Sequence, residues 1–66
     1  MSLKWIDVYD IAIELAVAFP NQDPKSVNFV DLRNWVVALK NFDDDVDRCG
    51  EKILEAIQMA WIEENE

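Results

Sequence analysis

The chain has 66 residues, the size of one small domain, and its 14 acidic and 6 basic side chains give a net charge of −8. This charge repels phosphate backbones and anionic lipids, which argues against nucleic-acid and membrane partners and favours basic protein surfaces or cations. Having no histidine and one cysteine, the chain lacks an internal disulfide and the usual zinc sites. No apolar run reaches the roughly 20 residues that span a bilayer, and no secretory signal pattern is present, so we expect a soluble, monomeric protein of the cytoplasm.

The first predicted helix begins after Asp7, a residue type that caps helices, and ends at Phe19 because Pro20 disfavours helical geometry at the residue before it. Its apolar side chains follow two faces of the helix. One face carries Val8, Ile11, Leu15 and Ala18 or Phe19, and the other carries Tyr9, Ile13 and Val17. We therefore expect a mostly buried helix, whose one wet edge is an acidic strip of Asp7, Asp10 and Glu14.

The segment after the first helix predicts a short helical turn. Asp23 is a capping residue, and Pro24 suits the first helical position, where its missing N–H would be unpaired in any case. One turn through Val27 follows, and a strand over residues 27–30 is the minor alternative. The next helix is expected from Asp31 to Lys40, with the apolar positions i, i+3, i+4 and i+7 filled by Leu32, Trp35, Val36 and Leu39.

The acidic loop from Asn41 to Gly50 follows no helical or strand period and has Phe42 as its apolar contact. Its carboxylates are Asp43, Asp44, Asp45 and Asp47, and Glu51 comes directly after it. It is not an EF-hand, because Arg48 and Leu54 stand where that loop requires Gly and Glu. Oxygen-only ligands of this kind suit weak, hydrated sites for hard cations or Fe²⁺, whereas a solvated acidic loop is the structural alternative.

The last helix has the clearest pattern in the chain. Ile53, Ile57 and Trp61 recur at i, i+4 and i+8, and Leu54 and Ala60 widen this apolar stripe. We expect a helix from Glu51 to Ile62 with Gly50 at the N-cap. The tail, residues 63–66, is expected to fray because acids at a helix C-terminus oppose the dipole.

Three main helices and one short helical turn predict an all-α fold, a small helical bundle with a winged-helix-like outline. DNA-reading modules share that outline, but a helix carrying Asp31, Arg33 and Lys40 has too little positive charge for that use. Trp35 and Trp61 lie on apolar faces and belong to the expected core. Trp5 lies outside any periodic segment and is expected to close one end of the bundle, partly exposed.

Catalysis is not expected, since the chain lacks histidine and the common nucleophile, metal and phosphate-binding motifs. Protein binding fits better, because the acidic strip and the acidic loop can share one side of so small a domain. A plain wet surface is the alternative interpretation of these acids.

Motifs along the whole chain carry a family resemblance. They are Leu3-Lys4-Trp5 with Asp7, Pro20, Asp23-Pro24, Val27, Phe29, Asp31-Leu32, Trp35-Val36, Phe42, Asp44-Asp45, and Glu51 with Ile53 to Gln58 and Ala60 to Ile62. This pattern resembles the IscX (YfhJ) family of small acidic accessory proteins of bacterial iron–sulfur cluster assembly. The resemblance implies a small winged-helix-like helical fold and no enzymatic activity. It also implies weak Fe²⁺ binding through surface carboxylates, and an acidic face that binds the cysteine desulfurase IscS in competition with a frataxin-type protein.

The resemblance and the acidic pattern together define two candidate sets. The carboxylates assigned to Fe²⁺ are Asp7, Asp43, Asp44, Asp45, Glu51 and Glu55. Those assigned to the desulfurase are Asp7, Asp10, Glu14, Asp23, Asp31, Asp44 and Asp45. The alternatives are a protein-binding regulator without a physiological metal and an acidic mimic of nucleic acid.

The chain departs from the family pattern at a few positions. The family usually has Arg at Asn28 and Thr at Val30, so a basic group and a side-chain helix cap are expected to be lost here. It commonly has Pro at Val46 and Ser-Asn at Cys49-Gly50, which predicts a more flexible acidic loop. Asn28→Arg is therefore expected to change partner affinity and to leave the melting temperature within about two degrees.

Overall fold

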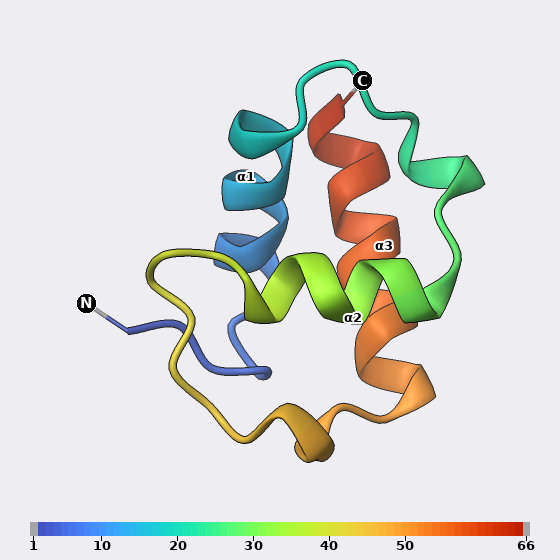
Figure 1. Ribbon diagram of the computed structural model, residues 1–66. Coiled ribbons are helices and arrows are strands. Elements are labelled where there is room, and N and C mark those ends of the chain that lie inside the picture. Colours follow the sequence, from blue (N-terminus) through green and yellow to red (C-terminus); the bar gives the residue numbers. More distant parts are fainter. Residues whose placement is uncertain (1, 66) are drawn as a thin grey trace.

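The computed structural model describes residues 2–65, which form three α-helices and two short 3₁₀ turns (Figure 1). Their order along the chain is α1 (Val8–Ala18), η1 (Pro24–Ser26), α2 (Phe29–Val37), η2 (Val46–Arg48) and α3 (Glu51–Asn65). The β structure of the described residues is one isolated parallel bridge between Leu3 and Phe42. The predicted all-α fold, with three main helices and a helical turn after Asp23, is confirmed. No helix within residues 2–65 has the length and apolar character needed to cross a membrane.

The core lies where the three helices meet. In Figure 1, α1 and α3 lie side by side and α2 crosses in front of them, and contacts join all three pairs of helices. The predicted stripe of α3 supplies its buried side chains, which are Leu54, Ile57, Ala60 and Trp61. From the other helices, Ile11, Leu15, Leu32 and Val36 are fully buried. Each large apolar side chain buried in this way contributes about 1.5–3 kcal/mol to stability.

Three aromatic side chains from three segments fill one end of the core. Phe19 stacks on Trp35 with ring centroids 4.8 Å apart, and Trp61 meets both rings at 6.4 and 6.3 Å. Trp61 is fully buried, as predicted, while Trp35 is only partly buried. Phe19 follows the last residue of α1, and its N–H donates to Leu15 O at 2.8 Å, so the predicted end of this helix before Pro20 is confirmed.

The prediction that α1 is mostly buried is wrong. Its buried residues are Ile11, Ala12 and Leu15, whereas Tyr9, Ile13 and Val17 are 72%, 45% and 72% exposed. The periodicity identified two apolar faces correctly, but a bundle of three helices covers only the one that turns toward α2 and α3. The second face of α1 is left in solvent.

Helix α2 begins at Phe29, two residues earlier than predicted, because Asn28 caps it. The Asn28 side-chain oxygen accepts the backbone N–H of Asp31 at 2.8 Å. The helix ends at Val37 rather than at Lys40. Since Phe29 and Val30 are helical, the alternative strand over residues 27–30 is excluded. Because Asn28 supplies a side-chain cap, the expected loss of such a cap is wrong.

The turn η1 is tied to α3 by side-chain hydrogen bonds. Asp23 Oδ1 accepts the Lys25 N–H at 3.0 Å, which confirms the predicted cap with Pro24 at the first helical position. Gln58 Nε2 donates to Pro24 O at 2.8 Å and to Val27 O at 3.2 Å. These bonds fix the connection between α1 and α2 against α3.

Helix α3 continues to Asn65, so the predicted fraying after Ile62 is wrong for residues 63–65, and Glu66 lies outside the described residues. The buried Trp61 holds the last turns against the core, and acids near a helix C-terminus cost only about 0.3–1 kcal/mol each. At the other end, Leu54 N donates to Gly50 O at 3.1 Å, which confirms Gly50 at the N-cap position.

Candidate functional site

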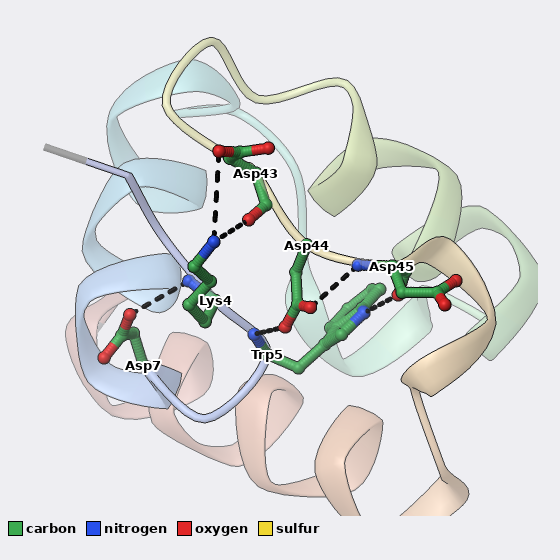
Figure 2. A network of polar contacts seen from close by, with 6 residues as sticks. All are labelled: Lys4, Trp5, Asp7, Asp43, Asp44 and Asp45. Atoms are coloured by element: carbon green, nitrogen blue, oxygen red, sulfur yellow. Dashed lines mark hydrogen bonds and ion pairs between the residues drawn. The ribbon is translucent and has the colours of Figure 1, made fainter.

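The N-terminal segment lies against the acidic loop and is held there by backbone hydrogen bonds. Leu3 N donates to Asn41 O at 2.7 Å, and Asp43 N donates to Leu3 O at 2.9 Å. The next contact comes from Trp5, whose indole Nε1 donates to Asp45 O at 2.7 Å (Figure 2). Its ring meets Phe42 edge to face, with centroids 4.7 Å apart. Trp5 is consequently 1% exposed, and the prediction of partial exposure is wrong.

The Asp44 carboxylate bridges these two segments. Its Oδ2 accepts the Trp5 backbone N–H at 3.0 Å, and its Oδ1 accepts the Asp45 N–H at 2.7 Å (Figure 2). The backbone N–H of Trp5, followed by that of Asp45, holds the pKa of the Asp44 carboxyl below its ordinary value. Asp45 Oδ1 in turn accepts the Asp47 N–H at 3.0 Å and caps η2. Both carboxylates therefore have structural roles that their spacing alone did not indicate.

Lys4 links the N-terminal segment to both the acidic loop and Asp7. Its Nζ donates to Asp43 O and lies 3.9 Å from Asp43 Oδ2, which is the one ion pair among residues 2–65. The Lys4 backbone N–H donates to Asp7 Oδ2 at 2.9 Å (Figure 2). Asp7 occupies the N-cap position of α1, but its side chain makes no capping bond to the helix, because the carboxylate turns back to Lys4.

The acidic strip joins the acidic loop at Asn41. Asn41 Nδ2 donates to Glu14 Oε1 at 2.9 Å, and a shallow hollow of about 260 Å³ lies between them and Asp10. Because Lys4 also links the two segments, the strip and the start of the loop form one side of the molecule. We call this side the acidic face, and its carboxylates are those of Asp7, Asp10, Glu14, Asp43 and Asp44.

The other candidate acids lie on other elements. Asp23 caps η1, and Asp31 lies in the first turn of α2. Glu51 and Glu55 belong to the first turns of α3, where Glu55 borders a shallow hollow with Lys52 and Met59. The structure thus brings together only part of each predicted set.

The described carboxylates do not form a preassembled metal centre. Within residues 2–65, no three Asp, Glu or Cys side chains are placed to hold one ion. Both oxygens of Asp44 and one oxygen of Asp45 already accept backbone N–H groups of the N-terminal segment and of the acidic loop.

Sequence reasoning missed an exposed apolar region beside the acidic face. A hollow of about 480 Å³ between the start of α1 and α3 is lined by Ile6, Tyr9 and Met59, which are 82%, 72% and 60% exposed. The sequence pattern places Tyr9 on an apolar face of a helix predicted to be mostly buried, and it assigns no role to Ile6 or Met59. The signal available in the sequence was that Met59 lies outside the apolar stripe of α3.

Comparisons with known proteins agree with the sequence motifs. The family model described as "Iron-sulphur cluster assembly" matches residues 3–66. The chain is similar to a Pseudomonas aeruginosa protein named "Uncharacterized protein PA3808", with 64% identity over 66 residues and coverage of 100% of both chains. This match extends over nearly the whole chain and supports a role in iron–sulfur cluster assembly. The chain belongs to the IscX-type family of iron–sulfur cluster assembly proteins.

Proposed function

We propose that the protein is a non-catalytic adaptor of iron–sulfur cluster assembly that binds the cysteine desulfurase IscS through its acidic face. The observation that carries this proposal is the joining of the acidic strip to the acidic loop by the Glu14–Asn41 and Lys4–Asp43 contacts. Five carboxylates on one side, with Lys4 as the only basic group in these contacts, complement a basic partner surface. The remaining predicted acids, Asp23, Asp31 and Asp45, contribute through the long-range field of the net charge of −8.

The fold supports a surface that is organised before binding. Trp5 and Asp44 fix the N-terminal segment and the acidic loop relative to each other, so the carboxylates of the acidic face need little ordering when a partner docks. A smaller loss of side-chain and loop freedom leaves more of the contact energy as affinity. We expect the protein to act in the cytoplasm as a monomer and to compete with a frataxin-type protein for the same basic surface.

Fe²⁺ binding is the part of the proposal that rests on fewer structural observations. Weak Fe²⁺ binding by Asp7, Asp43, Asp44, Asp45, Glu51 and Glu55 fits the oxygen-donor chemistry. The lack of three converging ligands within residues 2–65 favours a second candidate, a regulator that binds the desulfurase without a physiological metal. A titration with Fe²⁺ under anaerobic conditions separates the two, because only an iron adaptor shows saturable shifts at the loop acids.

The acidic face is tested by neutralising charge at two places. The double variant Asp10→Asn with Glu14→Gln removes two charges from the acidic face, and Asp47→Asn with Glu64→Gln removes two from elsewhere. We expect the first pair to weaken binding to purified IscS about tenfold or more, a change of about 1.4 kcal/mol, and the control pair to stay within about twofold. Equal weakening by both pairs would mean that only the net charge matters and would contradict a defined acidic face.

A further inference from the structure

The outer side of α1 carries an exposed apolar surface. Tyr9, Ile13 and Val17 recur at i, i+4 and i+8 and therefore lie on one side of the helix. At the N-terminal end of α1, this row meets the hollow that is lined by Ile6, Tyr9 and Met59. We call this region the apolar surface, and its members are Ile6, Tyr9, Ile13, Val17 and Met59. Contiguous exposed apolar side chains of this kind mark interaction sites.

Carboxylates border the apolar surface on two sides. Asp10 directly follows Tyr9 in the sequence, and Glu14 directly follows Ile13. Both acids line the 260 Å³ hollow together with Ile13. Glu63 lines the larger hollow on the side of α3. Glu55 is close to Met59, where Lys52 is the basic neighbour. The arrangement is an apolar centre between acidic margins.

We propose that the apolar surface docks an amphipathic helix of a partner protein, with the apolar side of that helix on Tyr9 and Ile13 and its Lys and Arg side chains toward the acidic margins. This inference rests on the proposed function, because Asp10 and Glu14 belong to both surfaces. Helices bind in this way by placing residues at i, i+3, i+4 and i+7 on an apolar groove. The 11 residues of α1 extend about 16 Å, so a partner helix of about 14 residues covers it.

Charge selects this occupant over a second copy of the same chain. Two copies would each bring a net charge of −8, with Asp10, Glu14 and Glu63 at the margins of the contact. Like charges brought together at an interface repel each other and oppose association. A cationic helix gains the same apolar burial and places opposite charges at both margins.

Synthetic peptides test the proposal directly. The probe is a 14-residue peptide of Leu and Lys with all Leu on one helical side. Its controls are a scrambled peptide of the same composition and a Leu/Glu version. Following backbone amides by NMR, we expect the amphipathic Lys peptide to bind at least about tenfold more tightly than the scrambled one. Its shifts should cluster at residues 6–17 and 55–63. Equal binding of the scrambled peptide, or no shifts in these ranges, would overturn the inference.

A matched pair of variants assigns the effect to the apolar surface. Tyr9 and Val30 are 72% and 71% exposed, so Tyr9→Ser and Val30→Ser remove similarly exposed apolar side chains from α1 and α2. We expect Tyr9→Ser to weaken binding of the amphipathic peptide about tenfold, and Val30→Ser to leave it within about twofold. Unchanged binding of Tyr9→Ser would overturn the inference, and melting temperatures near that of the wild type confirm that both variants fold.

The desulfurase separates this inference from the proposed function. If neutralising Asp10 and Glu14 weakens IscS binding while Tyr9→Ser does not, the proposed function stands and the apolar surface is not part of it, which overturns the inference. If IscS does not bind the wild type at all but the amphipathic peptide binds in a Tyr9-dependent way, the inference stands and the proposed function is wrong.

Discussion

At the scale of single residues, the two fully buried tryptophans Trp5 and Trp61 differ in what their indole N–H groups meet. Trp5 Nε1 donates to Asp45 O at 2.7 Å, whereas Trp61 Nε1 has no hydrogen-bond partner among the described residues. A buried polar group without a partner costs about 1–3 kcal/mol of stability, whereas a satisfied hydrogen bond contributes about 1 kcal/mol. A comparison of these two side chains therefore distinguishes the contribution of ring packing from that of the indole hydrogen bond.

Substitution of these tryptophans by phenylalanine tests the difference. Both changes remove ring volume from the core, but only Trp5→Phe leaves a carbonyl, that of Asp45, without its donor. We expect Trp5→Phe to lower the free energy of unfolding by at least about 1 kcal/mol more than Trp61→Phe, because Trp61→Phe also removes an unsatisfied buried donor; urea denaturation measures the difference. A larger loss for Trp61→Phe would show that packing around Trp61 outweighs the Trp5 hydrogen bond.

Asp44 gives the protein a defined acid sensitivity. Its pKa is lower in the folded state because the Trp5 and Asp45 N–H groups bind the charged form, so the folded state is favoured when the carboxylate is ionised. This contribution is complete above the ordinary Asp pKa of about 3.9 and is lost as pH falls through the lowered folded value. We expect the stability difference between wild type and Asp44→Asn to be constant from about pH 5 to 7 and to shrink below about pH 4. Asp47→Asn serves as the control, and a difference that grows as pH falls would contradict the role of Asp44.

At the scale of secondary-structure elements, Asn28 decides where α2 begins. Its side chain accepts the Asp31 N–H at 2.8 Å, and Arg cannot replace that acceptor. Loss of an N-cap costs about 0.5–2 kcal/mol, and 1 kcal/mol shifts the melting temperature of a domain this small by about 4–8 °C. We therefore expect Asn28→Arg to lower the melting temperature by several degrees, not the two or fewer expected from the sequence alone. Asn28→Ser retains an acceptor and is the control, and a melting temperature unchanged by Asn28→Arg would show that the cap is dispensable.

The helices were predictable because each has its own local sequence pattern of apolar spacing and capping residues. The stripe of Ile53, Ile57 and Trp61 predicted α3, and Asp23 with Pro24 predicted η1. What could not be predicted depends on residues far apart in the chain. Trp5 is buried because Asp44 and Asp45, some 40 residues later, accept its N–H groups. Local pattern likewise gives no information on how many sides of α1 the bundle covers.

The candidate site was likewise predictable only where it depends on local residue spacing. The spacing of Asp7, Asp10 and Glu14 placed three carboxylates along one helix, and the structure brings them to the start of the acidic loop. The structural use of the Asp44 and Asp45 carboxylates was not predictable, because it depends on backbone N–H groups of a loop without a repeat. The sequence pattern identifies the row of Tyr9, Ile13 and Val17 as apolar, but the prediction that this helix is mostly buried does not hold for that row.

At the scale of the whole molecule, the net charge of −8 sets the balance between stability and recognition. With one ion pair among residues 2–65, most carboxylates are not neutralised by a neighbour, and their repulsion opposes the compact state. Added salt shortens the range of this repulsion to about 10 Å at 0.1 M. We expect sodium chloride to raise the melting temperature by several degrees, and a millimolar divalent cation to do the same if it binds the native state. A melting temperature indifferent to both would show that the acids are too dispersed to repel one another.

The central claim is that the acidic face binds a basic surface of the cysteine desulfurase. Its most direct test is a titration of the isotope-labelled protein with purified IscS at low and high salt, with each backbone amide followed by NMR. We expect binding that weakens steeply with salt and shifts the amides of residues 7–14 and 43–45. Absence of binding at every salt concentration, or shifts confined to residues outside the acidic face, would contradict the claim.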